Sequence, residues 1–195
     1  MEKIAQFQDT KQRILAVGES LIVNRGFSDL GLSEILTTAK VPKGSFYHYF
    51  QSKEGFGVAL LERYFADYDE RLTTLFANDS SSMRDRILSY FTYWREKSAT
   101  HEGHNSCLAV KLAAEVSDLS EPMRCTLAEG MERITSQIAQ AIKLAQADGS
   151  VSAQKDPVEL AETLYSMWVG ASLVAKVKRS LLPLDLALQQ TELLL

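Results

Sequence analysis

A stretch of ten residues, Val41–Phe50, carries the side chains best suited to read nucleic acid. It spaces one cation, three hydroxyl groups and one imidazole along a segment of about two to three helical turns. These side chains are those of Lys43, Ser45, Tyr47, His48 and Tyr49. Cations and hydroxyl groups bind phosphate oxygens and base edges, so this composition predicts contact with a nucleic acid. Phe46 and Phe50 lie four residues apart, which predicts an apolar face that anchors the same helix.

The residues before this stretch predict the helices that position it. Apolar residues recur at helical spacing over residues 10–24, and Gly26 favours the end of that helix. A second helix is predicted over residues 32–38. Pro42 favours a new helix start, because the amide hydrogen that proline lacks has no partner in a first helical turn. These three helices predict a helix-turn-helix head, with a turn at residues 39–41 and a recognition helix that begins at Pro42 and runs to Phe50.

This head resembles that of the TetR family of bacterial transcriptional repressors. The resemblance depends on the recognition stretch and on Ser52-Lys53-Glu54, which matches the start of the family's fourth helix. It implies an all-α fold, in which a three-helix DNA-binding head precedes a larger helical body for sensing and dimerisation. The DNA-binding residues that it implies are Ser33, Lys43, Gly44, Ser45, Tyr47, His48, Tyr49 and Lys53. We expect six of them mainly to position the protein on phosphates: Ser33, Lys43, Tyr47, His48, Tyr49 and Lys53. Base reading is expected of Lys43, Ser45 and Tyr47, and Gly44 lets the helix approach the duplex closely.

Composition limits the class of protein. The chain has 195 residues, of which 46% are hydrophobic and 24% are charged, as expected of a soluble protein with a packed core. The sequence has no apolar run long enough to span a membrane and no recognisable signal-peptide core. Its two cysteines do not suggest a disulfide framework, so a cytoplasmic location is predicted.

The net charge of −4 would by itself argue against a nucleic-acid partner, but the charge is unevenly distributed along the chain. Residues 1–53 hold seven Lys or Arg and five Asp or Glu, so they carry +2 and the remainder carries −6. Phosphate attraction depends on the local field rather than on the total charge. Lys40, Lys43 and Lys53 cluster where a duplex would lie, although such a cluster alone is typical of any solvated surface.

Beyond the head, the pattern stays helical and predicts about nine helices for the whole chain. The later predicted helices are 53–76, one that ends near Ala99, 106–116, 122–147, 157–179 and 183–194. Prolines mark the last three starts, and Asp156 is the best cap among the residues that precede them. We divide the chain into a DNA-binding domain, residues 1–53, and a sensing and dimerisation domain, residues 54–195.

The last two predicted helices contain more apolar residues than one buried face requires. This excess predicts a partner surface, with complete burial inside one chain as the alternative. Proteins of the TetR family dimerise through these helices. A twofold dimer would place two recognition helices on one duplex, which predicts a palindromic operator.

Two features of the body are candidates for sensing a signal. Phe91, Trp94, Tyr165 and Trp168 recur at helical spacing and are candidates for a small-molecule pocket of the kind that such repressors enclose; plain core packing is the competing interpretation. Cys107 lies where a helix is predicted to begin. Amides and the positive dipole end in a first helical turn lower the pKa of a thiol, and the thiolate is the form that electrophiles and oxidants attack.

The segments around Cys107 and Lys176 resemble the electrophile-sensing branch of the TetR family, the N-ethylmaleimide-reductase repressors of the NemR branch. This resemblance implies that Cys107 and Lys176 are the sensing pair. A small buried cysteine is the alternative for Cys107, and Cys125 is predicted to be inert. A metal site of His101, His104 and Cys107 is a third interpretation, although a fourth ligand is not evident.

Taken together, these patterns predict a homodimeric, cytoplasmic TetR-like repressor. It would release a palindromic DNA operator when a small molecule binds or when the sensor cysteine is modified, without a metal, a cofactor or enzymatic activity. Two alternatives belong to other classes. One is a thiol-dependent enzyme with Cys107 as nucleophile and His101 or His104 as base, and the other is an all-α interaction module without a DNA role.

Overall fold

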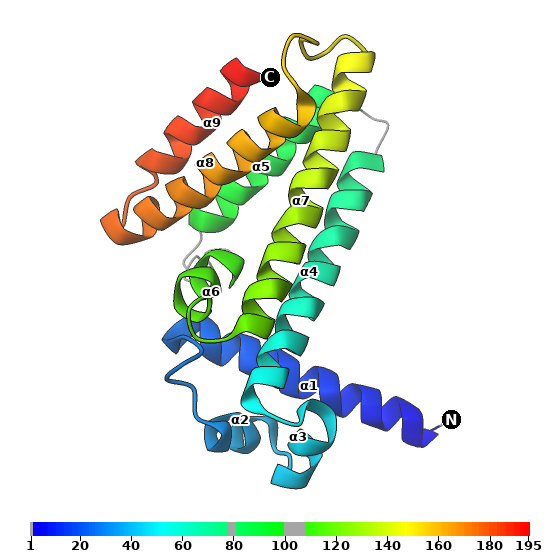
Figure 1. Cartoon of the computed structure of the whole chain (residues 1–195), viewed down its shortest axis with the longest axis vertical. Coiled ribbons are helices and arrows are strands. Elements are labelled where there is room, and N and C mark those ends of the chain that lie inside the picture. The colour runs from blue at the N-terminus through cyan, green and yellow to red at the C-terminus, as the bar shows by residue number, and fades with distance from the viewer. Residues whose placement is uncertain (1, 78–80, 100–107) are drawn as a thin grey trace. The chain divides into compact units, whose positions relative to one another are not determined.

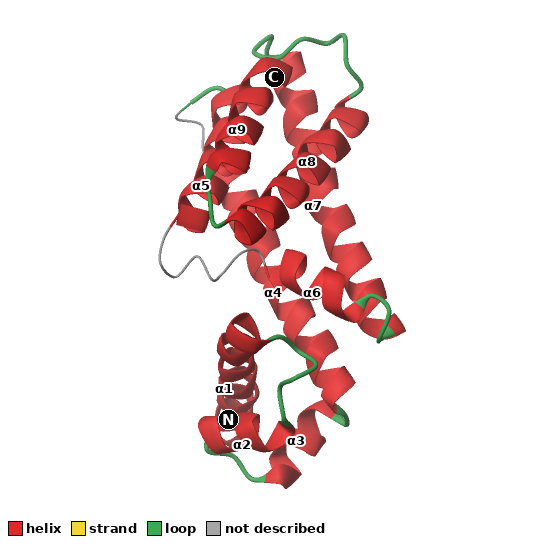
Figure 2. Cartoon of the chain, turned by 90° about the vertical axis from the view of Figure 1, so that its left-hand side faces the viewer, coloured by secondary structure: helices red, strands yellow, loops and turns green. Residues whose placement is uncertain are grey.

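The computed structural model describes residues 2–77, 81–99 and 108–195, and these residues form nine helices and no strand (Figures 1 and 2). The helices are α1 (Glu2–Arg25), α2 (Leu32–Ala39), α3 (Lys43–Phe50), α4 (Lys53–Ala77), α5 (Met83–Ala99), α6 (Leu108–Val116), α7 (Glu121–Ala147), α8 (Pro157–Lys178) and α9 (Leu182–Leu194). The predicted all-α fold is confirmed. Within the described ranges, no helix has the length and apolar character needed to cross a membrane.

The first three helices and the start of α4 pack around a small apolar core. Its fully buried side chains include those of Ile14, Ile22, Ile35, Phe46 and Phe56. Two turns with positive φ set the directions of the helices. Gly26, with φ +97°, ends α1 as predicted, and Lys40, with φ 53°, ends α2 in the left-handed conformation. The chain therefore reverses between α2 and α3, as a helix-turn-helix requires.

Two helix starts differ from the sequence prediction. α1 begins at Glu2 rather than near residue 10, because the preceding residues include good helix formers and no Pro or Gly interrupts them. α3 begins at Lys43, and Pro42 takes the N-cap position with an extended backbone, at φ −71° and ψ 151°. The other predicted ends of described helices agree with the structure to within one or two residues.

Packing divides the chain into two compact units. Unit 1 comprises residues 1–65 and 111–128, and unit 2 comprises residues 66–110 and 129–195. The boundary drawn from the sequence follows chain order, whereas packing adds the first half of α4, the end of α6 and the start of α7 to the head.

In unit 2, α5, α8 and α9 enclose buried aromatic side chains, and local signals set the start of α8. The Asp156 carboxylate accepts hydrogen bonds from the amides of Val158 (2.9 Å) and Glu159 (3.0 Å), and Pro157 occupies the first turn. The predicted cap at Asp156 is thereby confirmed. Gly149, with φ +79°, follows the end of α7.

Candidate nucleic-acid interface

An aromatic face fixes α3 in the head. Phe46 is fully buried and Phe50 is 4% exposed. Their ring centres lie 5.1 Å apart, and the ring of Phe56 from α4 lies 5.5 Å from Phe46 and 5.2 Å from Phe50. Aromatic rings at these separations attract each other beyond the effect of the area that they bury. The anchoring role predicted for Phe46 and Phe50 is therefore confirmed, and α3 is held against α4.

The opposite face of α3 presents polar groups to solvent. The exposed or half-buried residues on this helix are Lys43, Gly44, Ser45, Tyr47, His48 and Tyr49. Tyr47 is 43% exposed, and Lys43 Nζ lies 5.7 Å from the centre of its ring. A Cβ atom added at Gly44 would meet nothing within 4 Å, so another surface can approach the helix closely. Ser33 is also exposed, in the first turn of α2.

Lys53 differs from the other predicted DNA-binding residues because its ammonium donates a hydrogen bond within the head. Nζ donates a hydrogen bond of 3.0 Å to the carbonyl of Ser28, and it lies 4.9 Å from the centre of the Phe27 ring. Burial lowers the pKa of Lys53, and the negative charges of Glu115 and Asp29 oppose this shift. Lys53 therefore holds the turn between α1 and α2, in addition to the phosphate contact predicted for it.

Glu115 on α6 lies outside the set of residues predicted from the sequence, yet it contacts the same turn. Its carboxylate accepts hydrogen bonds from the backbone amides of Phe27 (3.0 Å) and Ser28 (2.6 Å). Burial acts to raise the pKa of Glu115, but these hydrogen bonds outweigh it and leave the pKa below its ordinary value. Because 88 residues separate Phe27 from Glu115, no local sequence pattern could have indicated this contact.

The predicted sensing residues are only partly described. Cys107, with His101 and His104, lies outside the described residues, so its pairing with Lys176 stays a prediction. Lys176 itself is exposed near the end of α8. Among the described residues, no group of three His, Cys, Asp or Glu side chains could hold a metal ion.

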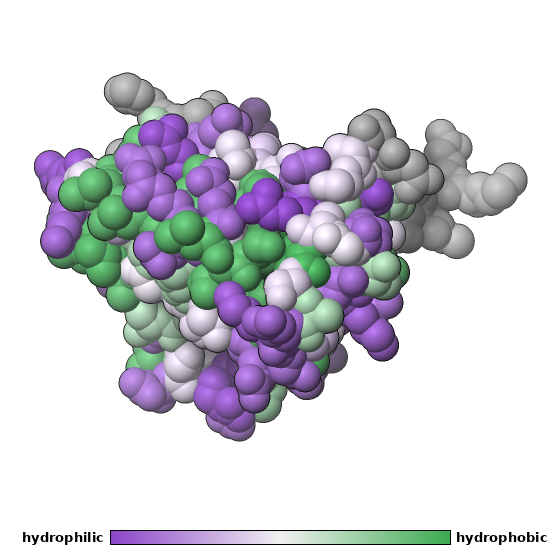
Figure 3. Space-filling view, turned by 90° about the horizontal axis from the view of Figure 1, so that it is seen from above, coloured by the Kyte–Doolittle hydropathy of each residue, from purple (hydrophilic) through white to green (hydrophobic). Residues whose placement is uncertain are grey.

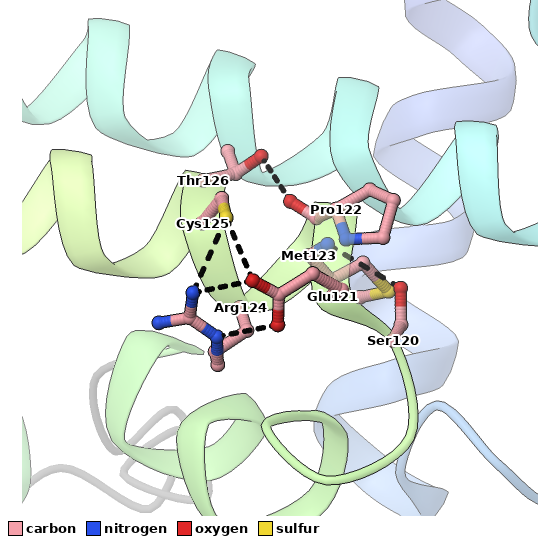
Figure 4. Close-up of polar contacts among 7 residues, drawn as sticks. All are labelled: Ser120, Glu121, Pro122, Met123, Arg124, Cys125 and Thr126. Carbon is pink, nitrogen blue, oxygen red and sulfur yellow. Dashed lines mark hydrogen bonds and ion pairs between the residues drawn. The ribbon is translucent and has the colours of Figure 1, made fainter.

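The second cysteine, Cys125, lies in the second turn of α7 beside two groups of opposite charge (Figure 4). Its sulfur lies 3.4 Å from Glu121 Oε1 and 3.4 Å from Arg124 Nη2. Arg124 donates to the Glu121 carboxylate and lowers the pKa of Glu121 to about 2. The guanidinium and the carboxylate are paired with each other, and the expectation that Cys125 is inert stays a prediction.

The four aromatic residues proposed for a ligand pocket come together in unit 2, where they are all buried. The ring of Phe91 stacks on that of Trp168 at 5.0 Å, and Trp94 lies 5.7 Å from Trp168 and 6.0 Å from Tyr165. The indole nitrogen of Trp94 donates to Ser172 (3.0 Å), and that of Trp168 donates to Thr191 (2.9 Å). These rings pack against one another, as expected of a core, so a ligand among them would have to separate them.

Known proteins match this chain along nearly its whole length. Residues 14–60 match the model for bacterial regulatory proteins of the tetR family, and residues 84–191 match that for the tetracyclin repressor-like C-terminal domain. The chain is 46% identical over 180 residues to the HTH-type transcriptional repressor NemR of Escherichia coli strain K12, which covers 92% of this chain and 90% of the relative. It is 36% identical over 167 residues to the transcriptional regulator AcuR of Cereibacter sphaeroides, covering 86% and 76% of the two chains. The crystal structure of reduced E. coli NemR matches with a TM-score of 0.89 and 46% identity, covering 94% of this chain and 95% of that one.

Proposed function

Because the chain belongs to the TetR family of bacterial regulatory proteins and is a DNA-binding transcriptional repressor, we propose that it binds a palindromic operator as a homodimer and releases it when an electrophile modifies Cys107. The observation that carries DNA binding is the division of α3 into a buried aromatic face and a polar face open to solvent. The identity with NemR across most of both chains supports the proposed release, as does the place of Cys107 in the sequence.

The exposed face of α3 enters the major groove. Lys43, Ser45 and Tyr47 contact base edges, since their donors stand on the accessible side of the helix. Lys43 and Tyr47 also contact phosphates, as do Ser33, His48, Tyr49 and the remaining donors of Lys53. Gly44 lets the helix approach the duplex closely, because no side chain stands there.

Exposed apolar stripes on α8 and α9 support dimerisation through these helices. The exposed residues are Leu173, Val174 and Val177 on α8 and Leu182, Leu186 and Leu193 on α9. On α8, Leu173 and Val174 lie four and three residues before Val177, and on α9 the three leucines are separated by four and seven residues, so each set lies on one side of its helix. Figure 3 shows apolar side chains gathered on the side where α8 and α9 lie. Contiguous apolar surface of this kind favours a partner, and a twofold dimer places the two heads on half-sites roughly 34 to 36 Å apart.

The release step is the addition of the Cys107 thiolate to an electrophile such as a maleimide. The sulfur forms a bond to one alkene carbon, the electron pair of the double bond moves to the neighbouring carbon, and that carbon takes a proton from water. Lys176 favours the thiolate by its positive charge if it lies near the sulfur. Cys107 immediately precedes Leu108, the first residue of α6, so the adduct forms at the start of that helix.

The proposal is tested by measuring operator affinity before and after treatment with N-ethylmaleimide. The operator is first selected from random duplexes, and binding is followed by fluorescence anisotropy with the parent protein, Cys107→Ser and Cys125→Ser. We expect the reagent to weaken the parent and the Cys125→Ser control at least about tenfold, a coupling within the usual allosteric range. The Cys107→Ser protein should keep its affinity. An equal loss in Cys107→Ser would remove the thiol from the mechanism, and the lack of a palindromic selected site would contradict DNA binding by a twofold dimer.

A further inference from the structure

At the C-terminal end of α1, the Val23 carbonyl and the Phe27 amide do not form the hydrogen bond that they would form in a longer helix. In a continuing helix the amide of Phe27 would donate to the carbonyl of Val23, four residues earlier. Gly26 turns the chain away with φ +97°, and the Phe27 amide donates to Glu115 instead. The carbonyl of Val23 therefore needs a partner from elsewhere.

One face of α6 supplies both partners. Lys111 Nζ donates to the carbonyl of Val23, and the Glu115 carboxylate accepts from the amides of Phe27 and Ser28. Lys111 and Glu115 lie four residues apart, so they share one face of α6. Figure 1 shows this helix beside the end of α1. An ammonium at the last carbonyls of a helix also interacts favourably with the helix dipole.

We propose that Lys111 and Glu115 of α6 are positioning residues that cap the end of α1, and that operator binding depends on this cap. The turn that they hold leads directly into α2, and Leu30 within it is fully buried. Lys53 of α4 donates to the carbonyl of Ser28 in the same turn. The start of α2, which supports α3, is therefore set by groups from α4 and α6 as well as by the head's own core.

The link from this cap to release depends on the proposed function. Cys107 lies four residues before Lys111 in the sequence and directly precedes the first residue of α6. An adduct that displaces the start of α6 draws Lys111 and Glu115 away from α1, leaving two amides and a carbonyl without their partners. The turn before α2 then loosens, and the recognition helices lose their register on the operator.

The cap is tested by substitutions in the whole protein, without any thiol reagent. We compare Glu115→Gln and Lys111→Met, which weaken or remove the cap, with Lys111→Arg, which keeps a charged donor, and with Glu62→Gln, a control at an exposed carboxylate of α4. Operator affinity is measured together with amide hydrogen exchange of Phe27 and Ser28. We expect Glu115→Gln and Lys111→Met to bind about tenfold more weakly and to exchange these amides faster. Lys111→Arg and Glu62→Gln should resemble the parent.

Several outcomes would overturn the proposal. Parental affinity in both Glu115→Gln and Lys111→Met would show that operator binding does not need the cap. Equal losses in Lys111→Arg and Lys111→Met would assign the effect to packing rather than to the donated hydrogen bond. This pair of variants still decides the question if Glu115→Gln fails to fold.

Treatment with N-ethylmaleimide distinguishes a failure of the proposed cap from a failure of the proposed release through Cys107. If N-ethylmaleimide leaves the parent's operator affinity unchanged, the proposal of thiol-triggered release is wrong. The cap is still tested by the operator affinities of the variants without the reagent. If the cap transmits the signal, the reagent should weaken Glu115→Gln by a smaller factor than it weakens the parent. The same factor in both proteins would contradict the link from α6 to the head.

Discussion

At the scale of single residues, Lys43 and Lys53 look alike in the sequence but differ in their surroundings. Lys43 is exposed on α3, beside the ring of Tyr47. Lys53 is half-buried and donates to the carbonyl of Ser28. The first is placed mainly to meet DNA, whereas the second also stabilises the head. Their substitution should therefore affect binding and stability to different degrees.

Replacing Lys43 by Ala should reduce the salt dependence of operator binding without a comparable loss of stability. Removing one charged group from a DNA phosphate lowers the slope of log affinity against log salt by about 0.9. Replacing Lys53 by Ala should lower the free energy of unfolding by about 1 kcal/mol, because the hydrogen bond to Ser28 is lost. Binding titrations at several salt concentrations and urea unfolding of both variants measure these effects. Equal losses of stability in the two variants would contradict the assignment.

The lowered pKa of Glu115 sets the sign of a pH effect. The folded state favours the charged carboxylate, so its stabilising contribution is fully present above the ordinary pKa of 4.5 and is lost as the pH falls through the lower folded value. Glu115→Gln should therefore be less stable than the parent at pH 7, and the difference should narrow below pH 4.5. Urea unfolding at a series of pH values measures this difference. A difference that stays constant would mean that the charge of Glu115 does not contribute.

The sequence could predict the roles of residues whose partners are close in the sequence, but not of those whose partners are distant. The two faces of α3 follow from the spacing of Phe46 and Phe50, so they could be predicted from eight residues. Lys111 contacts Val23 and Glu115 contacts Phe27, in each case across 88 positions of the sequence. A Glu or Lys in a helix has no local signature that would indicate such a distant partner. The DNA-facing side chains were therefore accessible to sequence reasoning, and the groups that hold the head from α6 were not.

At the scale of elements, two of the helix starts that were predicted correctly have a capping residue directly before the helix. α4 begins after Ser52, whose hydroxyl accepts from the amide of Gly55 (2.9 Å), and α8 begins after Asp156. Both caps lie beside the helices that they serve, so sequence could indicate them. The predicted start of α1 is too late. Asp9 and Thr10 are residue types that favour a helix cap, whereas in the structure the helix-forming residues before them continue the helix to Glu2.

Removal of the cap at Asp156 should destabilise α8 measurably. Asp156→Ala loses hydrogen bonds to the amides of Val158 and Glu159, which should lower the free energy of unfolding by about 1 kcal/mol. Asp156→Asn keeps a side-chain oxygen that accepts these bonds, so it should lose much less. Urea unfolding of the two variants and the parent provides the comparison. A loss in Asp156→Asn as large as that in Asp156→Ala would point to the carboxylate charge rather than to the hydrogen bonds.

At the scale of the whole molecule, the exposed apolar residues of α8 and α9 form the surface proposed for dimerisation. Family resemblance and helical periodicity were enough to predict the all-α fold and a surplus of apolar residues on the last helices. They could not predict which side chains remain exposed, because burial depends on packing between distant helices. They also could not predict that residues 111–128 pack with the head, since no periodicity encodes such a pairing.

The exposed stripe on α8 can be tested with one charged substitution. Val177 is 76% exposed, so Val177→Asp should leave the folded chain intact, whereas in a dimer an aspartate would be buried in the apolar interface without a partner. We expect the variant to sediment as a monomer and to lose most of its operator affinity, because each head then binds its half-site alone. Leu119→Asp is a matched control, since Leu119 is 68% exposed and lies outside α8 and α9. Its sedimentation should match that of the parent dimer. If Val177→Asp also sediments as the parent does, the interface must lie on another face, and the spacing of the two recognition helices would have to be derived from that face instead.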